Sequence, residues 1–168
     1  MTLLKIQLVE KQVTLDDDVF TRLQHFKYYQ IGNGQTLGRT FRRKNFTEAG
    51  VFTKTTIHWQ SLANDVMQTE GIVYDHIDRN PLNMQRNNLR PANNSQNGFN
   101  RKKPTSSVSK FKGVAFDNRC KRKPWYAFIK VWGKQKTLGY FATEEEAAKA
   151  YNEAALIIAK EFAALNKI

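Results

Sequence analysis

An aspartate and a histidine stand side by side at the end of a short apolar run. Ile72, Val73 and Tyr74 lead directly into Asp75 and His76. Hydrolysis of a phosphodiester requires a base that deprotonates water and a cation that offsets charge on the phosphate and the leaving oxygen. Histidine suits the first task because its ordinary pKa lies near neutrality. The aspartate offers a hard oxygen ligand of the kind that magnesium or manganese binds, so the pair indicates metal-assisted hydrolysis.

The elements around this pair must bring further polar side chains to it. A loop rich in asparagine follows and is broken by a proline, and a second short segment surrounds Leu89 and Arg90. Residues 93–101 begin with asparagine and serine, as helices often do. We therefore expect the order strand, loop, strand, helix. Because adjacent strand residues point to opposite faces, Asp75 and His76 can serve one site only at a strand end or a twist.

The motifs resemble those of a known nuclease family. The string Asp-His-Ile-Asp-Arg-Asn-Pro-Leu-Asn at residues 75–83 is followed by Asn-Leu-Arg and then by Ser-Gln-Asn, which ends at Asn97. This order is similar to that of the HNH endonucleases, in particular the phage and intron homing type, whose active site is a ββα-metal fold. The resemblance implies that His76 is the general base and that Asp75 and Asn97 bind one Mg²⁺ or Mn²⁺ ion.

The resemblance also implies a central asparagine that orients the loop and the catalytic histidine without reacting. Asn88 is the best match, and Asn83 and Asn87 compete with it. Isolated pieces of the motif have ordinary structural explanations, since an Asp-His pair is usually a surface hydrogen bond and an Asn-rich loop is usually a series of turns. The complete set in order favours a nuclease. We interpret Asp78, Asn80 and Asn83 as turn-forming residues.

Composition and charge indicate the class of partner. The chain has 168 residues, of which 40% are hydrophobic and 25% charged, and a formal net charge of +12. This excess of positive charge predicts a polyanionic partner, nucleic acid ahead of an anionic membrane. No apolar run has transmembrane length, and charges near the N-terminus come too early for a signal peptide. We expect no membrane partner and an intracellular, cytoplasmic protein, encoded by a phage or mobile element and acting in a bacterial host cell.

The single cysteine limits the chemistry further. Cys120 excludes an internal disulfide and a cysteine-rich zinc site. We therefore expect no structural zinc. Separately, the nuclease interpretation includes no small-molecule cofactor.

The first half of the chain predicts short strands and helices. Strand patterns occur at residues 3–15 (a strand or hairpin), 26–31, 36–46 and 51–58. Three aspartates at 16–18 open a short helix, where the helix dipole favours acids, and consecutive helical residues do not share one metal-binding face. Another short helix begins near Leu62. The basic cluster of Arg39 and residues 42–44 suits the backbone of DNA or a solvated face, and we favour DNA.

From Lys110 onward the pattern predicts a three-stranded antiparallel sheet and one long helix. The strands cover residues 111–116, 125–131 and 136–141, separated by turn-forming segments. Thr143 and Glu146 form a capping box at the start of the helix. The helix carries an apolar stripe, and a sheet of three strands needs such a cover. The stripe consists of Ala147, Ala148, Tyr151, Ala154, Ala155, Ile158 and Phe162.

This second half resembles a family of DNA-binding domains. The order Lys-Gly-Val, Trp-x-Ala-x-Ile, Leu-Gly-x-Phe, Glu-Glu-Ala-Ala-x-Ala-Tyr and Leu-Asn, between Lys110 and Asn166, is similar to the plant ethylene-response-factor domain of the Apetala-two fold. The resemblance implies base-reading strand residues at Lys112, Trp125, Lys130 and Thr137. Several of the positions that are Arg or Trp in the plant proteins differ here, so no target sequence carries over.

A sheet with one face on a helix and the other rich in basic residues fits the major groove of duplex DNA. The predicted DNA-binding set is Arg101, Lys102, Lys103, Lys110, Lys112, Arg119, Lys121, Arg122, Lys123, Trp125, Lys130, Lys134, Lys136 and Thr137.

Together these features predict an α+β protein of two domains. We expect a β-rich segment and a ββα-metal nuclease domain at 1–103 with its core at about 70–103, a linker at 104–109, and the DNA-binding domain at 110–168. The predicted function is site-directed hydrolysis of duplex DNA, as a nick or a double-strand break, by a monomer or homodimer. The alternatives are a non-catalytic, sequence-specific DNA-binding protein derived from such a nuclease, and a binder of structured RNA. We expect deletion of 110–168 to weaken specificity more than the chemistry.

Overall fold

The structure is a computed structural model that describes residues 2–5, 12–31, 36–46, 48, 50, 52–103 and 108–168. Over these ranges it is a mixed α+β protein with small antiparallel sheets and four α-helices. The chain divides into two units, Met1–Pro91 and Ala92–Ile168. Residues 104–107 of the expected linker lie outside the described ranges. No helix within those ranges is long and apolar enough to cross a membrane.

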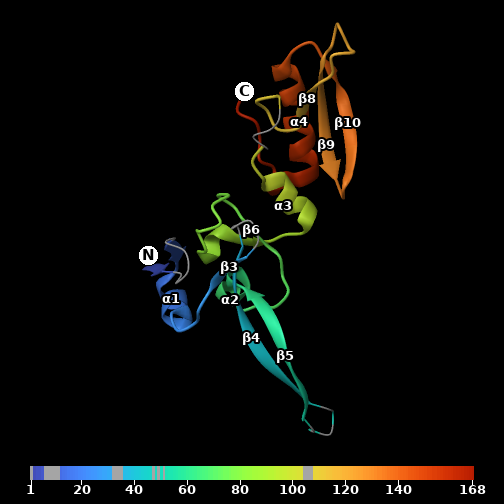
Figure 1. The fold of residues 1–168 in the computed structure, drawn as a ribbon. Helices are drawn as coiled ribbons and strands as arrows, with labels where there is room; N and C mark the ends of the chain where they lie inside the picture. Colours follow the sequence, from blue (N-terminus) through green and yellow to red (C-terminus); the bar gives the residue numbers. More distant parts are fainter. Residues whose placement is uncertain are drawn as a thin grey trace. The chain divides into compact units, whose positions relative to one another are not determined.

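The described part of the first unit contains three small antiparallel sheets and two α-helices. Its elements are β1 (Thr2–Lys5), β2 (Gln12–Leu15), α1 (Asp17–Leu23), β3 (Tyr29–Ile31), β4 (Thr36–Phe46), β5 (Phe52–Ser61), α2 (Leu62–Met67), β6 (Tyr74–His76), the 3-10 helix η1 (Arg86–Asn88) and β7 (Leu89–Pro91). β1 pairs with β2, the second sheet has the order β3-β4-β5, and β6 pairs with β7. In Figure 1, β4 and β5 form a long two-stranded ribbon that extends from the rest of this unit.

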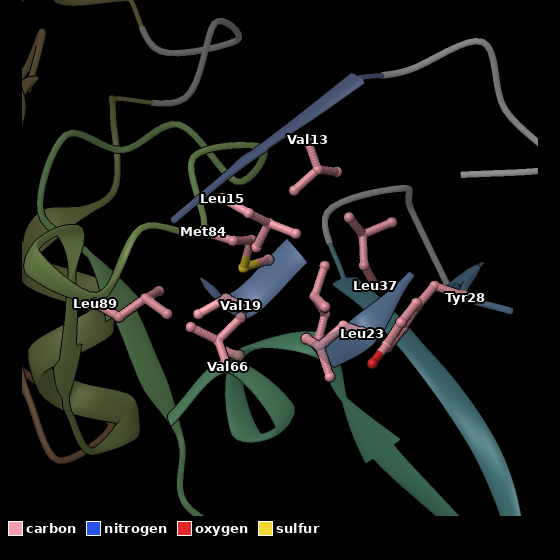
Figure 2. Close-up of a cluster of buried hydrophobic side chains, with 11 residues drawn as sticks. Val13, Leu15, Val19, Leu23, Tyr28, Leu37, Val66, Met84 and Leu89 are labelled. Atoms are coloured by element: carbon pink, nitrogen blue, oxygen red, sulfur yellow. The ribbon is translucent and has the colours of Figure 1, made fainter. Parts of the chain in front are cut away.

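The core of the first unit forms where β2 meets α1 and α2. Alternation along β2 buries Val13 and Leu15, and helical spacing along α1 buries Val19 and Leu23. All four belong to one cluster with Met84 of the loop between β6 and β7, and Figure 2 shows the Met84 sulfur beside Leu15 and Val19. The core therefore includes a residue of the segment that carries the predicted chemistry.

A buried carboxylate joins the base of the ribbon to α2. Asp65 is 6% exposed and accepts hydrogen bonds from the Tyr28 hydroxyl at 2.7 Å and from Arg39 at 2.6 and 2.8 Å. The Arg39 guanidinium also lies over the Phe26 ring, 4.2 Å from its centroid. In this structure Arg39 therefore neutralises a buried acid, because an unpaired charge there would be costly. The rest of the predicted basic cluster, the side chains at 42–44, lies outside the described part of the structure.

The second unit contains a three-stranded antiparallel sheet and the long helix that the sequence predicts. Its elements are α3 (Asn94–Asn100), β8 (Val114–Phe116), β9 (Trp125–Val131), β10 (Lys134–Phe141), α4 (Glu144–Ala159) and the 3-10 helix η2 (Lys160–Phe162). The strand order is β10-β9-β8. Ala127 and Ile129 of β9 are buried in clusters with Ala147, Tyr151 and Ala155 of α4. The predicted capping box at the start of α4 is present.

The first strand of this sheet is shorter than predicted. It begins at Val114 rather than at 111, because Gly113 adopts φ +71°, which strands do not contain. A Cβ atom at this position would lie 1.9 Å from the Tyr151 ring. The Gly113 carbonyl accepts a hydrogen bond from the Phe128 amide at 2.8 Å. The glycine thus forms a close contact between the start of β8 and α4.

Candidate functional site

The Asp-His pair lies at the end of β6. Antiparallel pairing with β7 places Asp75 opposite Arg90 and His76 opposite Leu89. Asp75 is 7% exposed, and its Oδ2 accepts hydrogen bonds from Arg90 Nε at 2.9 Å and Nη2 at 2.7 Å. A buried carboxylate needs such a partner. His76 is the last residue of β6, so the pair lies at a strand end, one of the two positions that allow adjacent residues to serve one site.

His76 is half-buried beside the core of the first unit. Its Nε2 lies 3.4 Å from the sulfur of Met84, which is 2% exposed. Burial lowers the pKa of His76, and the negative charges of Asp78 and Asp75 oppose this shift. The shift favours the neutral imidazole, which is the form that accepts a proton.

Asn88 holds the loop between β6 and β7 from its far end. Its side chain is 7% exposed and donates to Asp78 Oδ1 at 2.9 Å and to the Asn83 carbonyl at 2.8 Å. Its Oδ1 accepts from the Asp78 amide at 3.0 Å, and its carbonyl accepts from the Ile77 amide at 2.9 Å. Of the three candidates for the central asparagine, Asn88 is buried, Asn83 is half-buried and Asn87 is exposed. Asn88 thus fixes the backbone directly after His76.

Side chains inside the loop form consecutive turns. Asp78 Oδ1 accepts from the Asn80 amide at 2.8 Å, and Asn80 Oδ1 accepts from the Leu82 amide at 3.1 Å. Asn83 repeats the pattern with the Gln85 amide at 3.3 Å. These are the local side-chain-to-backbone bonds by which Asp and Asn stabilise turns. The interpretation of Asp78, Asn80 and Asn83 as turn-forming residues is confirmed.

Two segments from the start of the chain anchor this loop. Thr14 of β2 donates its amide to the Leu82 carbonyl at 2.8 Å and accepts from the Met84 amide at 2.9 Å. Asp16 Oδ2 accepts from the Arg86 amide at 3.0 Å, and the Arg86 guanidinium forms an ion pair with Asp18. The aspartates at 16–18 open α1 as predicted, and two of them also bind the loop.

Asn97 lies on α3, in the second unit, whereas Asp75 and His76 belong to the first. α3 begins with a capping box, in which Asn93 accepts from the Gln96 amide and the Gln96 side chain accepts from the Asn93 amide. Asn97 is half-buried, and its amide donates to the Asn93 carbonyl at 3.0 Å. Among the described residues, no cluster of three or more His, Cys, Asp and Glu could hold a metal ion. The predicted metal ligands are instead the carboxylate of Asp75 and the amide oxygen of Asn97, and oxygen ligands of this kind suit Mg²⁺ or Mn²⁺.

The strand register divides the predicted DNA-binding residues between two faces. Ala127 and Ile129 point towards α4. The residues that alternate with them along β9, which are Tyr126, Phe128 and Lys130, therefore lie on the outer face. Lys130 is opposite Gln135 on β10, and Thr137 is opposite Phe128. Lys130 and Thr137 therefore belong to the outer face.

Other members of the set lie on the side of the sheet that α4 covers. Lys136 is opposite Ile129, and Lys134 is opposite Val131. Trp125 packs against the buried cluster, with its ring edge-to-face on Phe116 at 5.0 Å between centroids. By strand register, Lys134, Lys136 and Trp125 therefore lie on the face of the sheet that packs against α4.

The remaining basic residues surround the sheet. Arg101, Lys102 and Lys121–Lys123 are exposed, and Lys103 is half-buried. Arg119 donates two hydrogen bonds to Asp117, and this lowers the pKa of Asp117 to about 2. Lys110 forms an ion pair with Glu145 at 2.8 Å. Lys112 is half-buried and donates to backbone carbonyls at the end of α3. Their contacts with DNA stay a prediction.

Sequence reasoning missed two groups that the structure reveals. Arg90 was assigned no role, although its pairing with Asp75 follows from the antiparallel register. The outer face also carries neighbouring aromatic rings that are tilted against one another, with the centroid of Tyr126 5.9 Å from that of Phe128 and 5.6 Å from that of Tyr140. Strict alternation with the small and apolar residues Ala127 and Ile129 was the signal that could have identified them.

Comparison with known proteins supports the nuclease interpretation. An uncharacterized HNH endonuclease of Acanthamoeba polyphaga mimivirus is 39% identical over 97 residues, which are 58% of this chain and 48% of that protein. The chain resembles an HNH endonuclease. Protein 3.8 of Escherichia phage T7 is 39% identical over 66 residues, 39% of this chain and 53% of that protein. The chain spans about half the length of the curated relatives it matches. No family model and no solved structure matches it.

Proposed function

We propose that this chain is a homing-type HNH endonuclease that hydrolyses phosphodiester bonds of duplex DNA with one divalent metal ion. His76 is the general base, Asp75 and Asn97 are the metal ligands, and Asn88 orients the loop. The observation that carries the proposal is the end of β6, where a buried aspartate and a half-buried histidine are adjacent and Asn88 fixes the loop that follows. The 39% identity to an HNH endonuclease supports it.

The residues of the chain have separate tasks in this proposal. A bound Mg²⁺ or Mn²⁺ ion supplies positive charge at the scissile phosphate. His76 takes a proton from the attacking water, and the Asn88 bonds hold the backbone directly after it. Arg90 keeps the Asp75 carboxylate in one orientation, and a carboxylate accepts about four bonds, so this ion pair is compatible with a metal. Arg90 is thus a positioning residue.

A supercoiled-plasmid assay tests the proposal. Wild-type protein is incubated with magnesium or manganese, with and without a chelator, on a plasmid that carries sequence from the protein's own genomic neighbourhood. We expect conversion to nicked or linear DNA that the chelator abolishes, and the first product distinguishes nicking from double-strand cleavage. Binding without conversion would favour the non-catalytic DNA-binding protein.

We further propose that the second unit binds the duplex, as its resemblance to the Apetala-two type of domain implies. What supports this is the three-stranded sheet on α4, whose outer face presents Lys130 with the rings of Tyr126, Phe128 and Tyr140. Lysine and arginine contacts with phosphates release counterions, so the binding constant should fall steeply as salt rises. A flat salt dependence in a fluorescence-anisotropy titration would contradict this part of the proposal. Tighter binding to RNA than to duplex DNA in a competition titration would do the same.

A further inference from the structure

The C-terminal end of α3 is capped by a lysine from another part of the second unit. Lys112 Nζ donates hydrogen bonds to the carbonyls of Gly98 at 3.2 Å, Phe99 at 2.5 Å and Arg101 at 2.7 Å. The last carbonyls of any helix lack partners within the helix. A cation at this end also interacts favourably with the helix dipole. Lys112 therefore satisfies the end of α3 both by hydrogen bonds and by charge.

Lys112 is itself held by two asparagines. Its amide donates to Asn166 Oδ1 at 2.7 Å, and its carbonyl accepts from Asn166 Nδ2 at 3.0 Å. Asn152 of α4 fixes Asn166 in turn, through bonds of 2.8 and 3.0 Å to its amide and carbonyl. The next residue, Gly113, lies against the Tyr151 ring. The backbone from which the lysine extends is thus tied to α4.

α3 is also part of the hydrophobic core of this unit. Phe99 is 6% exposed and packs in a cluster with Ile129, Tyr151 and Phe162. Its carbonyl accepts from the Ala164 amide at 3.2 Å as well as from Lys112. The sheet, α4 and the segment after η2 therefore all hold the short helix.

We propose that Lys112 is a positioning residue for the nuclease reaction, because it fixes the end of α3 and with it Asn97. The proposal rests on the proposed function, in which Asn97 is a metal ligand. Asn97 directly precedes Gly98, the first residue whose carbonyl the lysine binds. Groups that orient metal ligands typically change metal affinity or activity by about 10- to 100-fold when removed. Within the second unit, Lys112 then supports the helix that carries one of the proposed metal ligands.

This proposal changes the expected result of a deletion. Removal of residues 110–168 would remove Lys112 and the core around Phe99, so the catalytic step should be lost together with specificity. The sequence alone predicted that this deletion would weaken target specificity more than the cleavage chemistry.

The test compares Lys112→Met with Lys149→Met in the full chain. Lys149 is an exposed lysine of α4, so its variant loses the same charge without touching α3. We measure the single-turnover rate constant at saturating DNA, the metal concentration at half-maximal rate, the Kd for duplex DNA, and hydrogen exchange in α3. For Lys112→Met we expect a rate or metal affinity about 10- to 100-fold lower. The Kd for duplex DNA separates this effect from the predicted DNA contact of Lys112. Amides of residues 97–101 should exchange faster, and Lys149→Met should behave as wild type.

Two further variants keep the proposal falsifiable. Lys112→Arg retains the charge and should recover part of the rate. Asn166→Ala releases the backbone of Lys112 but keeps its ammonium group, so it should also lower the single-turnover rate constant. This variant provides the test if Lys112→Met does not fold. Weaker DNA binding with an unchanged rate at saturating DNA would assign Lys112 to the DNA contact and overturn the proposal. Unchanged hydrogen exchange in α3 of Lys112→Met would overturn the proposal independently of activity. A wild-type protein that does not cleave DNA would instead overturn the proposed function.

Discussion

Replacing Asn88 by alanine should destabilise the first unit because the loop after His76 depends on that side chain. The substitution removes two hydrogen bonds donated to Asp78 and Asn83 and one accepted from the Asp78 amide. The neighbouring Asn87 is exposed and provides a matched control, since Asn87→Ala makes the same chemical change one residue away.

The size of the effect follows from the type of these bonds. A neutral hydrogen bond contributes about 0.5–1.5 kcal/mol and one to a charged group about 1.5–3 kcal/mol. Asp78 is exposed, so water replaces part of what it loses. We therefore expect Asn88→Ala to lower the free energy of unfolding by about 2–4 kcal/mol, and Asn87→Ala by less than about 0.5 kcal/mol, as at ordinary surface positions.

Urea unfolding followed by circular dichroism gives both values, and hydrogen exchange at the Ile77 and Asp78 amides locates the change. Faster exchange there in Asn88→Ala, but not in Asn87→Ala, is the expected result. Equal destabilisation by the two substitutions would refute the assignment of Asn88 as the residue that holds the loop.

Two further predictions concern the second unit and the buried tyrosines. Gly113→Ala should lower the free energy of unfolding by about 3 kcal/mol or more, because a Cβ would lie 1.9 Å from the Tyr151 ring. Gly133→Ala is the control: Gly133 has φ +79° and nothing within 4 Å of a Cβ, so the loss should be only about 1 kcal/mol. Equal losses of stability in thermal unfolding would contradict the contact between Gly113 and Tyr151. Burial raises the pKa of Tyr151 to about 12, and burial with the nearby Asp65 raises that of Tyr28 as well. Unfolded tyrosine ionises near pH 10, so stability should fall as pH rises from about 10 to 12. In an ultraviolet titration, the step that Tyr151→Phe removes should lie above the ordinary tyrosine range. If the substitution instead removed a step near pH 10, the burial of Tyr151 would be contradicted.

The sequence predicts the elements whose signals are local. The capping box at Thr143 and the alanine stripe of α4 lie within a few turns of helix, so periodicity alone identifies them. The turns at Asp78 and Asn80 are equally local, because each side chain bonds the backbone two residues further on. The position of His76 at a strand end needed the register of β6 and β7, which the sequence left open.

The contacts that give these elements their function come from distant parts of the chain. The Arg86 amide binds Asp16, 70 residues earlier, and Lys112 binds Gly98 and Phe99 across residues for which the sequence suggested a linker. A lysine in a basic segment carries no local sign of which acceptors it meets. The resemblance to the Apetala-two type of domain and the basic composition predicted a DNA contact for Lys112, which stays a prediction; the cap on α3 could be found only in the structure.

The most direct test of the account compares His76→Ala with His25→Ala on the plasmid described above, with cleavage and DNA binding measured on the same preparations. His25 is exposed and lies two residues after α1, so its variant controls for the loss of a histidine. We predict that wild type and His25→Ala convert the plasmid with metal, and that His76→Ala binds DNA with the wild-type Kd but does not cut it. Cleavage by His76→Ala at the wild-type rate would contradict the assignment of the general base and of the site at the end of β6.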